Sequence, residues 1–460
     1  MASDRPAGTG AFDAHHPPPR ELVDDCVHCG FCLPTCPTYL LWGEEMDSPR
    51  GRIHLMKTAL EGEPLPSMVP HFDQCLGCMA CVTACPSGVQ YDRLIEATRA
   101  QVERRHPRSR RERALRAAVF SLFPYPRRLR ALRPLVRAYQ RTGAERLAQR
   151  LPLPPTLAAM RQLLPPVTET RPLPEVTSPV GARRARVGLL LGCVQREFFA
   201  GVNAATARVL AAEGCEVVAP EIQGCCGALS VHMGREGEAI GFAQRLVATF
   251  ERYDVDAIVV NAAGCGSAMK DYGWVLRDEP GWRERAEAFS AKVRDVSEWL
   301  MELGPAAVRH PLEVTVAYHD ACHLAHAQGV RAQPRSLLGA IPGLRLREIG
   351  EPEICCGSAG VYNLLQPDTA RELGDRKAAH VAATGADLLV TANPGCLMQV
   401  HSALRRRGES MRLAHPVEVL DASLRGLPAA SIGRSPASPP PAGTGLRRRR
   451  KSLPGHSPVS

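Results

Sequence analysis

The sequence predicts an α/β protein in which a small helical module precedes two similar halves, each built on a parallel sheet. Two observations predict this arrangement. Eight cysteines near the N-terminus form two matching runs, and the chain after residue 187 repeats short apolar segments, cysteines and helical stretches at a nearly constant interval. Strands that alternate with helices form parallel sheets with right-handed crossovers. We therefore expect a helical N-terminal module and a duplicated α/β region.

The two N-terminal runs have the same spacing. Each reads Cys, two residues, Cys, two residues, Cys, three residues, Cys, Pro, over residues 26–37 and 75–86. Bacterial ferredoxins hold cubane iron–sulfur clusters with this run, and its fourth cysteine ligates the other cluster. Structural zinc sites instead use two separated ligand pairs. The runs therefore predict a ferredoxin-type module with two [4Fe-4S] clusters, the first held by Cys26, Cys29, Cys32 and Cys85 and the second by Cys75, Cys78, Cys81 and Cys36.

The composition predicts a protein of the reducing cytoplasm. The chain has 460 residues, enough for two or three domains. Its first twenty residues contain no apolar core of a secretion signal, and no apolar run approaches the about 18 residues that span a bilayer. The 17 cysteines are then expected to be metal-binding thiols rather than disulfides. Any contact with a membrane would be peripheral.

Composition also divides the chain into six segments. Pro-, Gly- and Ser-rich ends predict disorder, and a Pro-rich stretch predicts an extended linker. A helix over about residues 91–105 should close the ferredoxin-type module. The expected segments are a disordered N-terminus (1–20), the two-cluster module (21–100), an Arg-rich helical segment with a Pro-rich linker (101–186), two cysteine-rich halves (187–310 and 311–425) and a disordered tail (426–460).

Positive charge is concentrated in two places. The spacer between the cysteine runs carries Arg50, Arg52 and Lys57, which should raise the reduction potential of the anionic clusters or dock an acidic partner, unless they form an ordinary solvated helix face. Residues 101–150 hold 15 arginines and three glutamates among apolar residues, and prolines should break this stretch into short helices. Such helices can lie on an anionic membrane, cover another subunit or form a solvated linker. No nucleic-acid-binding motif accompanies them, so nucleic acid is not an expected partner.

The region after residue 187 is duplicated. In each half a cysteine follows an apolar strand, a Cys-Cys-Gly string comes next, and another cysteine follows a later strand. Because the carboxyl ends of parallel strands share one edge of a sheet, these loops should bring four sulfurs together. The candidate ligands are Cys193, Cys225, Cys226 and Cys265 in the first half, and Cys322, Cys355, Cys356 and Cys396 in the second. Matching cysteines are separated by 129 to 131 residues.

Other residues near these cysteines have weaker signals. Cys215 has no counterpart in the second half, so we expect it in the core. Four histidines, His232, His319, His323 and His326, could donate hydrogen bonds to a cluster or be ordinary loop residues. Gly227 and Gly357 allow the backbone to approach a cofactor closely.

Together, these motifs resemble the iron–sulfur subunit of bacterial glycolate oxidase. The wider Cys-Cys-Gly (CCG) family includes one of the subunits of heterodisulfide reductase and one of those of the anaerobic glycerol-3-phosphate dehydrogenase. The resemblance covers about residues 21–425. Its specific strings are TCPTY (35–39), DSPRGRI (47–53), TACPSGVQY (83–91), GCVQ (192–195), NAATARVL (203–210), GCCGA (224–228) and CCGSAG (355–360).

The resemblance implies an oxidoreductase subunit that passes electrons from glycolate, through FAD on partner subunits, to the membrane quinone pool. It also implies a location at the inner face of the cell membrane. The heterodisulfide reductase relatives end each half in Cys-x-x-Cys, whereas this chain has Ala268 and Gln399 at the last position. That difference leaves open whether the halves hold noncubane clusters, ordinary [4Fe-4S] clusters or one cluster in total.

The residues themselves predict an electron carrier without its own substrate site. A Gly-x-Gly follows a strand at residues 264–266, but Met269 replaces the third glycine of a dinucleotide fingerprint. Iron–sulfur clusters move single electrons and do not themselves oxidise an alcohol. An iron–sulfur subunit for D-lactate or sn-glycerol-3-phosphate oxidation would share nearly all of these features, and a heterodisulfide-reductase-like enzyme is a third alternative.

Overall fold

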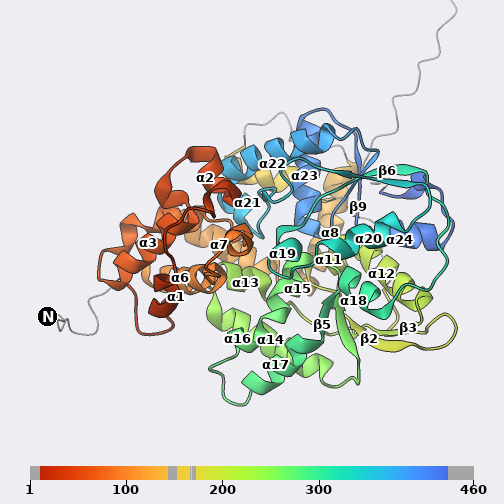
Figure 1. Ribbon diagram of the computed structural model, residues 1–460, viewed down its shortest axis with the longest axis horizontal. Coiled ribbons are helices and arrows are strands. Elements are labelled where there is room, and N and C mark those ends of the chain that lie inside the picture. The colour runs from red at the N-terminus through yellow and green to blue at the C-terminus, as the bar shows by residue number, and fades with distance from the viewer. Residues whose placement is uncertain (1–10, 143, 145–152, 166, 168–171, 434–460) are drawn as a thin grey trace, which may run out of the picture.

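The computed structural model describes residues 11–142, 144, 153–165, 167 and 172–433 (Figure 1). A helical N-terminal module packs against two α/β halves. This arrangement confirms the predicted fold class, because each half contains a sheet whose principal strands are parallel. Within the described ranges, helices with the length and apolar composition of a membrane span are absent.

Short helices separated by cysteine loops form the N-terminal module. Helix α3 begins after Ser48, whose hydroxyl accepts a hydrogen bond from the Gly51 amide (3.0 Å), and Pro49 occupies its first position. The core of the module includes Met56, Phe72 and Leu94, all fully buried. The helices are α1 (Arg20–Asp24), α2 (Pro37–Trp42), α3 (Pro49–Leu60), α4 (Val69–Gln74), α5 (Ala80–Ala84) and α6 (Tyr91–Arg105).

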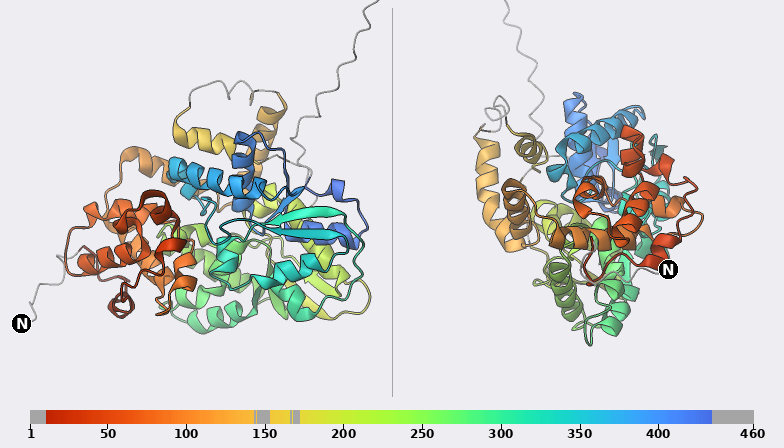
Figure 2. Two further views of the ribbon diagram at one scale, coloured as in Figure 1. Left: turned by 45° about the horizontal axis from the view of Figure 1, so that its top comes forward. Right: turned by 90° about the vertical axis from the view of Figure 1, so that its left-hand side faces the viewer.

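The Arg-rich segment forms helices α7 (Arg110–Leu122) and α8 (Pro126–Arg141), which lie side by side at one edge of the molecule in the right-hand view of Figure 2. Two expectations for this region were wrong. Pro134 lies inside α8 without ending it, and the Pro-rich linker contains a further helix, α10 (Pro155–Gln162). Proline at position 155 starts α10 because its fixed φ suits the first turn of a helix.

The first half contains a five-stranded sheet in the order β1-β3-β2-β4-β5. Strand β1 pairs antiparallel at one edge, and the other pairings are parallel. Its strands are β1 (Val176–Thr177), β2 (Ala185–Leu189), β3 (Cys215–Val218), β4 (Ala257–Val260) and β5 (Val293–Asp295). Its helices are α11 (Val194–Phe198), α12 (Ala200–Ala212), α13 (Ala228–His232), α14 (Glu236–Phe250), α15 (Ala263–Lys270), α16 (Tyr272–Val275), α17 (Arg283–Lys292) and α18 (Val296–Leu303).

The second half has a four-stranded, all-parallel sheet in the order β7-β6-β8-β9. This order repeats that of β3-β2-β4-β5, so the duplication seen in the cysteines extends to the topology. Its strands are β6 (Val314–Tyr318), β7 (Leu344–Glu348), β8 (Leu388–Val390) and β9 (Arg412–Ala414). Its helices are α19 (Cys322–Ala325), α20 (Ala332–Gly339), α21 (Tyr362–Leu365), α22 (Pro367–Ala382), α23 (Pro394–Arg406) and α24 (Pro416–Leu424).

The two halves share one hydrophobic core. Val187 and Val217 of the first sheet belong to the same buried cluster as Val316 and Leu388 of the second. Helices α12 and α24 pack across the boundary, where Arg208 binds Asp421 with two hydrogen bonds of 2.8 and 2.6 Å. The halves are therefore held together as one body.

The predicted disorder of residues 1–20 and 426–460 was wrong for the parts that the structure describes. Asp13 accepts hydrogen bonds from Gln101 and Arg104 of α6, and Ala11 is buried. At the other end, Ile432 is 4% exposed, and the carbonyls of Ala429 and Ile432 accept from Arg412. Residues 1–10 and 434–460 lie outside the described part of the chain.

Candidate iron–sulfur centres

The first N-terminal cysteine set surrounds a small cavity close to the surface. Cys26, Cys29, Cys32 and Cys85 line it, together with Cys81. Cys29 is exposed and the other three members of the set are half-buried. Burial raises the pKa of the Cys32 thiol to about 11. This set therefore sits where a cofactor would be near solvent.

The backbone on both sides of each middle cysteine adopts positive φ. The values are 55° at His28 and 87° at Gly30 around Cys29, and 65° at Gly77 and 63° at Met79 around Cys78. Alternating right- and left-handed residues turn successive N–H groups inward and form concavities that bind anions. Positive φ at His28 and Met79 is uncommon for side chains of this size, and its occurrence in both loops fits a pair of cluster cradles.

The second set is deeply buried. Cys36, Cys75, Cys78 and Cys81 are each 8% exposed or less. Burial raises the pKa of Cys81 well above its usual value, and the adjacent sulfurs of Cys78, Cys75 and Cys36 add to the rise. The four sulfurs are therefore neighbours, and burial disfavours a free thiolate at Cys81.

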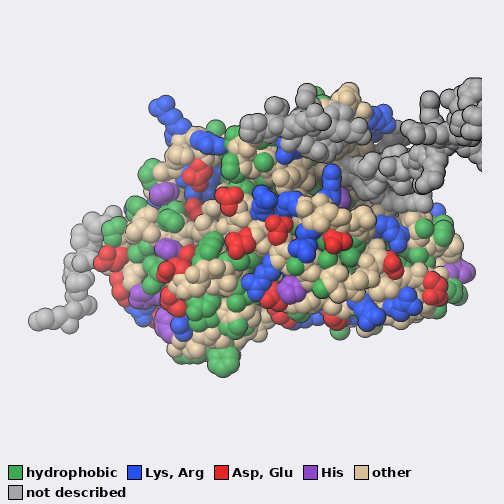
Figure 3. All heavy atoms as spheres, turned by 90° about the horizontal axis from the view of Figure 1, so that it is seen from above, with side chains coloured by type: hydrophobic (Ala, Val, Ile, Leu, Met, Phe, Trp, Pro, Cys, Tyr) green, Lys and Arg blue, Asp and Glu red, His purple; other side chains and the backbone are tan. Residues whose placement is uncertain are grey.

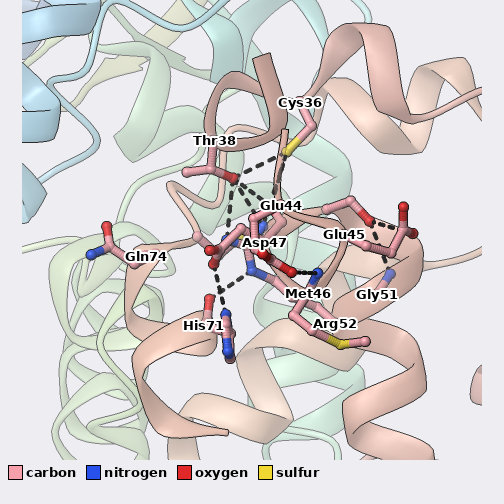
Figure 4. Close-up of polar contacts among 12 residues, drawn as sticks. Cys36, Thr38, Glu44, Glu45, Met46, Asp47, Gly51, Arg52, His71 and Gln74 are labelled. Atoms are coloured by element: carbon pink, nitrogen blue, oxygen red, sulfur yellow. Dashed lines mark hydrogen bonds and ion pairs between the residues drawn. The ribbon is translucent and has the colours of Figure 1, made fainter. Parts of the chain in front are cut away.

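Arg52 is buried beside the second set (Figure 4). Its guanidinium is 1% exposed and lies 3.9 Å from Cys36 Sγ, while Nη2 donates to Asp47 Oδ1 at 3.1 Å and Nε to the His71 carbonyl at 2.6 Å. Burial alone would raise the pKa of the Cys75 thiol, but the charges of Arg52 and Arg99 outweigh it and lower that pKa. The sequence placed Arg52 near the clusters but gave no sign of its burial.

The other two basic residues of the spacer differ from Arg52. Arg50 Nη1 donates to the His28 carbonyl at 3.0 Å, in the loop of the first cysteine set, and its Nε binds Glu45 at 2.6 Å. Lys57 pairs with Asp24 at 2.9 Å and is 40% exposed. Arg50 thus touches a candidate cluster loop, whereas Lys57 is an ordinary surface ion pair.

The cysteines of each CCG half gather at the carboxyl ends of its strands. Cys193 follows β2 and its Sγ lies 3.6 Å from that of Cys225, while Cys226 contacts Cys265 of α15. The second half repeats these pairs, with 3.9 Å between Cys322 and Cys355 and a contact between Cys356 and Cys396. Cys215 does not join these groups. It is fully buried in β3, within the hydrophobic core that the two halves share, as expected.

Several polar side chains lie close to the cysteine sulfurs of the second CCG half, at distances that the sequence alone could not predict. His319 lies with Cys356 and Cys396 in a group whose ligand atoms are all within 4.8 Å of one another. His323 Nδ1 is 3.6 Å from Cys322 Sγ, and Asn393 Nδ2 donates to Cys396 Sγ at 3.4 Å. His326 binds Thr83 of the N-terminal module at 2.8 Å instead of a sulfur.

The N-terminal module brings its second set against the second CCG half. Leu76, Cys78 and Ala80 belong to one buried cluster with Cys355 and Tyr362. Cys322 packs on this cluster, and its proximity helps to raise the pKa of the Cys78 thiol. The second N-terminal cysteine set is therefore adjacent to the cysteines of the second CCG half, an arrangement that spacing along the chain did not predict.

The donor sets suit iron–sulfur clusters. All 17 cysteines are free of disulfides, and 16 of them fall into four groups of four. Soft thiolate groups of this kind select iron–sulfur clusters or zinc. In the first CCG half the amide of the glycine after Cys-Cys reaches a sulfur, since Gly227 N donates to Cys225 Sγ at 3.4 Å. Amide-to-sulfur bonds tune iron–sulfur clusters.

Comparison with known families agrees with this geometry. Residues 22–89 match the 4Fe-4S dicluster domain, residues 111–164 match the linker region of the glycolate oxidase iron–sulfur subunit, and residues 187–270 and 316–401 each match the cysteine-rich domain. A probable glycolate oxidase iron–sulfur subunit of Bacillus subtilis is 39% identical over 87% of this chain and 93% of its own length. The glycolate oxidase iron–sulfur subunit of Escherichia coli is 35% identical over 88% and 94%.

This chain belongs to the glycolate oxidase iron–sulfur subunit family. The membership makes it an electron-transfer component of an oxidoreductase. Lactate utilization protein A of an Exiguobacterium strain is also similar, with 31% identity over 52% of this chain and 98% of its own length. The match to glycolate oxidase subunits is broader, because it includes most of the chain.

The number of clusters in an iron–sulfur subunit of this type can be measured directly. We expect anaerobically purified protein to contain about sixteen irons, because four groups of four sulfurs each suit a four-iron cluster. About eight irons would mean that only the N-terminal module is filled, and about twelve that one cluster serves both CCG halves. Iron and sulfide analysis, with the spectrum of each reduced cluster, distinguishes these outcomes.

Proposed function

We propose that this chain carries electrons from FAD on partner subunits of a glycolate oxidase to quinone in the membrane. Bound four-iron clusters would supply one-electron carriers between a two-electron flavin and a quinone. The observation that supports the proposal best is the asymmetry of the N-terminal module. One cysteine set lies near solvent, and the other is buried against cysteines of the second half.

The proposed ligands follow the four sulfur groups. Cys26, Cys29, Cys32 and Cys85 would hold the first [4Fe-4S] cluster, and Cys75, Cys78, Cys81 and Cys36 the second. Cys193, Cys225, Cys226 and Cys265 would hold a third cluster, and Cys322, Cys355, Cys356 and Cys396 a fourth. Arg52 would stabilise the reduced, more negative state of the second cluster, and Arg50 would stabilise that state of the first cluster.

The exposed loop of the first set is the proposed contact with the FAD subunit. Val27 is 69% exposed and Phe31 65% exposed, on either side of the exposed Cys29. Large apolar side chains at this level of exposure are suited to burial in a protein interface. A partner seated here would bring its flavin to the cluster that lies closest to solvent.

Helices α7 and α8 carry the proposed membrane contact, which we call the basic surface. It consists of the exposed residues Arg110, Arg113, Arg127, Arg128, Arg141, Leu132 and Leu135. Leu135 is 68% exposed among these arginines. On the face seen in Figure 3, basic and acidic side chains are interspersed. Basic helices with exposed leucines bind anionic headgroups, each arginine contributing about 1 kcal/mol. The need for reduced thiols favours the cytoplasmic face.

The membrane contact predicts salt-dependent binding to vesicles. The complex should sediment with vesicles containing phosphatidylglycerol at low salt and be released at high salt. A variant with Arg127→Gln, Arg128→Gln and Leu135→Gln should lose most of this binding. An Arg283→Gln, Arg285→Gln and Val308→Gln variant, changed at exposed positions elsewhere, is the matched control. Equal binding by both variants would contradict a role for the basic surface.

The proposed function is tested with the complex isolated through a tag on this chain. We expect a flavoprotein to co-purify and the complex to reduce a short-chain quinone with glycolate as the donor. Reduction driven by D-lactate or sn-glycerol-3-phosphate, but not by glycolate, would identify a different donor. Failure of the co-purified complex to pass electrons from any of these donors to this chain would overturn the proposal.

A further inference from the structure

A cavity of about 490 Å³ lies between the N-terminal module, α7 and the second CCG half. Leu76, the residue after Cys75, forms part of its wall, and so do Val102 of α6, Leu115 of α7 and Tyr362 of α21. Pro66 and Pro70 also line it and are exposed. The volume is within the range of about 300–1,000 Å³ that holds small ligands. The cavity is separate from the four sulfur groups but borders the loop of the second set.

The buried arginines in the wall bind carboxylates or backbone carbonyls of this chain, and Arg111, which also lines the cavity, is exposed. Arg108 binds both carboxylate oxygens of Asp73, at 2.8 and 3.0 Å, and Glu112 at 2.6 Å. Arg116 binds Glu112 at 3.2 Å, and Arg99 donates to the carbonyls of His232 and Cys75. Their hydrogen-bonding capacity is therefore largely used inside the protein. This pattern does not favour an anionic ligand such as a carboxylic acid, and it suits a neutral one.

The remaining wall combines apolar surface with hydrogen-bonding groups. Val69, Leu76 and Val102 are each 6% exposed or less and provide the apolar part. Among the described residues, the buried Nδ1 of His106, the Nδ1 of His232 and the Nε of Arg108 make no hydrogen bond, although His232 Nδ1 lies 3.9 Å from Glu96 Oε1. A buried polar atom without a partner is costly unless something binds it. A flat ring with a carbonyl oxygen at each end matches such a wall.

We propose that this cavity binds the ring of a quinone and is the site where quinone is reduced. The proposal rests on the proposed function, since it names the place where electrons leave the chain. Two electrons, released when the donor alcohol is oxidised on the partner subunits, would reach the ring one at a time from the iron–sulfur cluster that the neighbouring Cys75–Cys81 loop would help to hold. Each carbonyl oxygen takes up one proton from solvent, so quinone, two electrons and two protons give quinol.

The location of α7 connects this cavity with the membrane. Leu115 and Arg116 of α7 line the cavity, whereas Arg110 and Arg113 of the same helix belong to the basic surface. Arg111, which is exposed, lines the cavity as well. If α7 lies on the headgroups, the cavity is close to the layer from which a lipid-soluble quinone would enter.

The proposal is tested by filling the cavity. In the purified complex, Leu115→Trp should raise the KM for decylubiquinone at least about tenfold. Reduction of a dye directly at the partner flavin, iron content and cluster spectra should remain unchanged. Leu157→Trp, at an exposed position of α10 outside the cavity, is the matched control and should behave like the wild type. A Leu115→Trp complex with wild-type KM would overturn the site.

A second measurement does not depend on a variant that folds. An azido-ubiquinone, activated by light in the wild-type complex, should label peptides that contain residues 66–76 or 106–116, and excess decylubiquinone should prevent the labelling. Labelling confined to other peptides, while the complex still reduces decylubiquinone, would overturn this cavity and leave the proposed function intact. A wild-type complex that reduces no quinone would refute both.

Discussion

Replacing Cys26 by serine is expected to lower glycolate-driven quinone reduction by the complex at least ~100-fold, since even changes outside the ligand set cost about 10–100-fold at metal sites. A serine hydroxyl lacks the soft thiolate that iron–sulfur clusters require. Reduction of a dye directly at the partner flavin should stay largely intact, and iron content should fall by about four atoms. Steady-state assays with the two acceptors, together with iron analysis, measure these changes.

Cys215→Ser provides the matched control for this experiment. Cys215 is also buried, but it lies in β3 within the main core and outside the four sulfur groups. Its replacement should cost about 1–3 kcal/mol of stability, through burial of a hydroxyl, and leave iron and quinone reduction unchanged. Loss of flavin-dependent dye reduction in an assembled Cys26→Ser complex would contradict the division of work between the chains.

The local patterns of the sequence predicted most of the fold, and they predicted that Cys193 lies near Cys225 and Cys322 near Cys355. Spacing within each N-terminal run fixes three cysteines on one loop, and Cys-Cys-Gly strings mark corresponding loops of two parallel sheets. Helix α6 has the predicted bounds, Tyr91–Arg105, because its apolar positions recur at helical spacing up to the end at His106. Such features depend on residues close together in the chain.

Features that depend on distant contacts were missed. Nothing in the sequence indicated that Cys78 lies against Cys355, because that contact arises from packing of the N-terminal module on the second half. Ala11 and Ile432 were assigned to disordered ends on the basis of composition, yet each is buried in a hydrophobic cluster. Pro134 remains within α8, where Arg130 and Arg133 bind the buried carboxylate of Glu197 and help to hold the helix in place.

The burial of Arg52 leads to a prediction for the second cysteine set. Arg52→Met should lower the reduction potential of the cluster held there, because a positive charge favours the more negative, reduced state. A unit charge at the 3.9 Å between Nη1 and Cys36 Sγ contributes roughly 4 kcal/mol at an effective dielectric of about 20. The opposite charge of Asp47 offsets part of this energy. Since a tenfold change in the equilibrium constant corresponds to about 59 mV for one electron, the reduction potential should shift by on the order of 100 mV. Redox titration followed by electron paramagnetic resonance measures it.

Two further variants separate a role in the potential from a purely structural one. Arg52→Met also leaves the carboxylate of Asp47 without its buried partner, which should cost about 3–5 kcal/mol of stability. Arg52→Lys keeps the positive charge but loses the planar fork of the guanidinium. Its reduction potential should therefore shift by less than about half as much as that of Arg52→Met, while stability still falls.

Arg50→Met should lower the reduction potential of the first cluster and leave that of the second unchanged, since Arg50 contacts the loop at His28. An unchanged second potential in Arg52→Met would mean that this guanidinium only supports the fold.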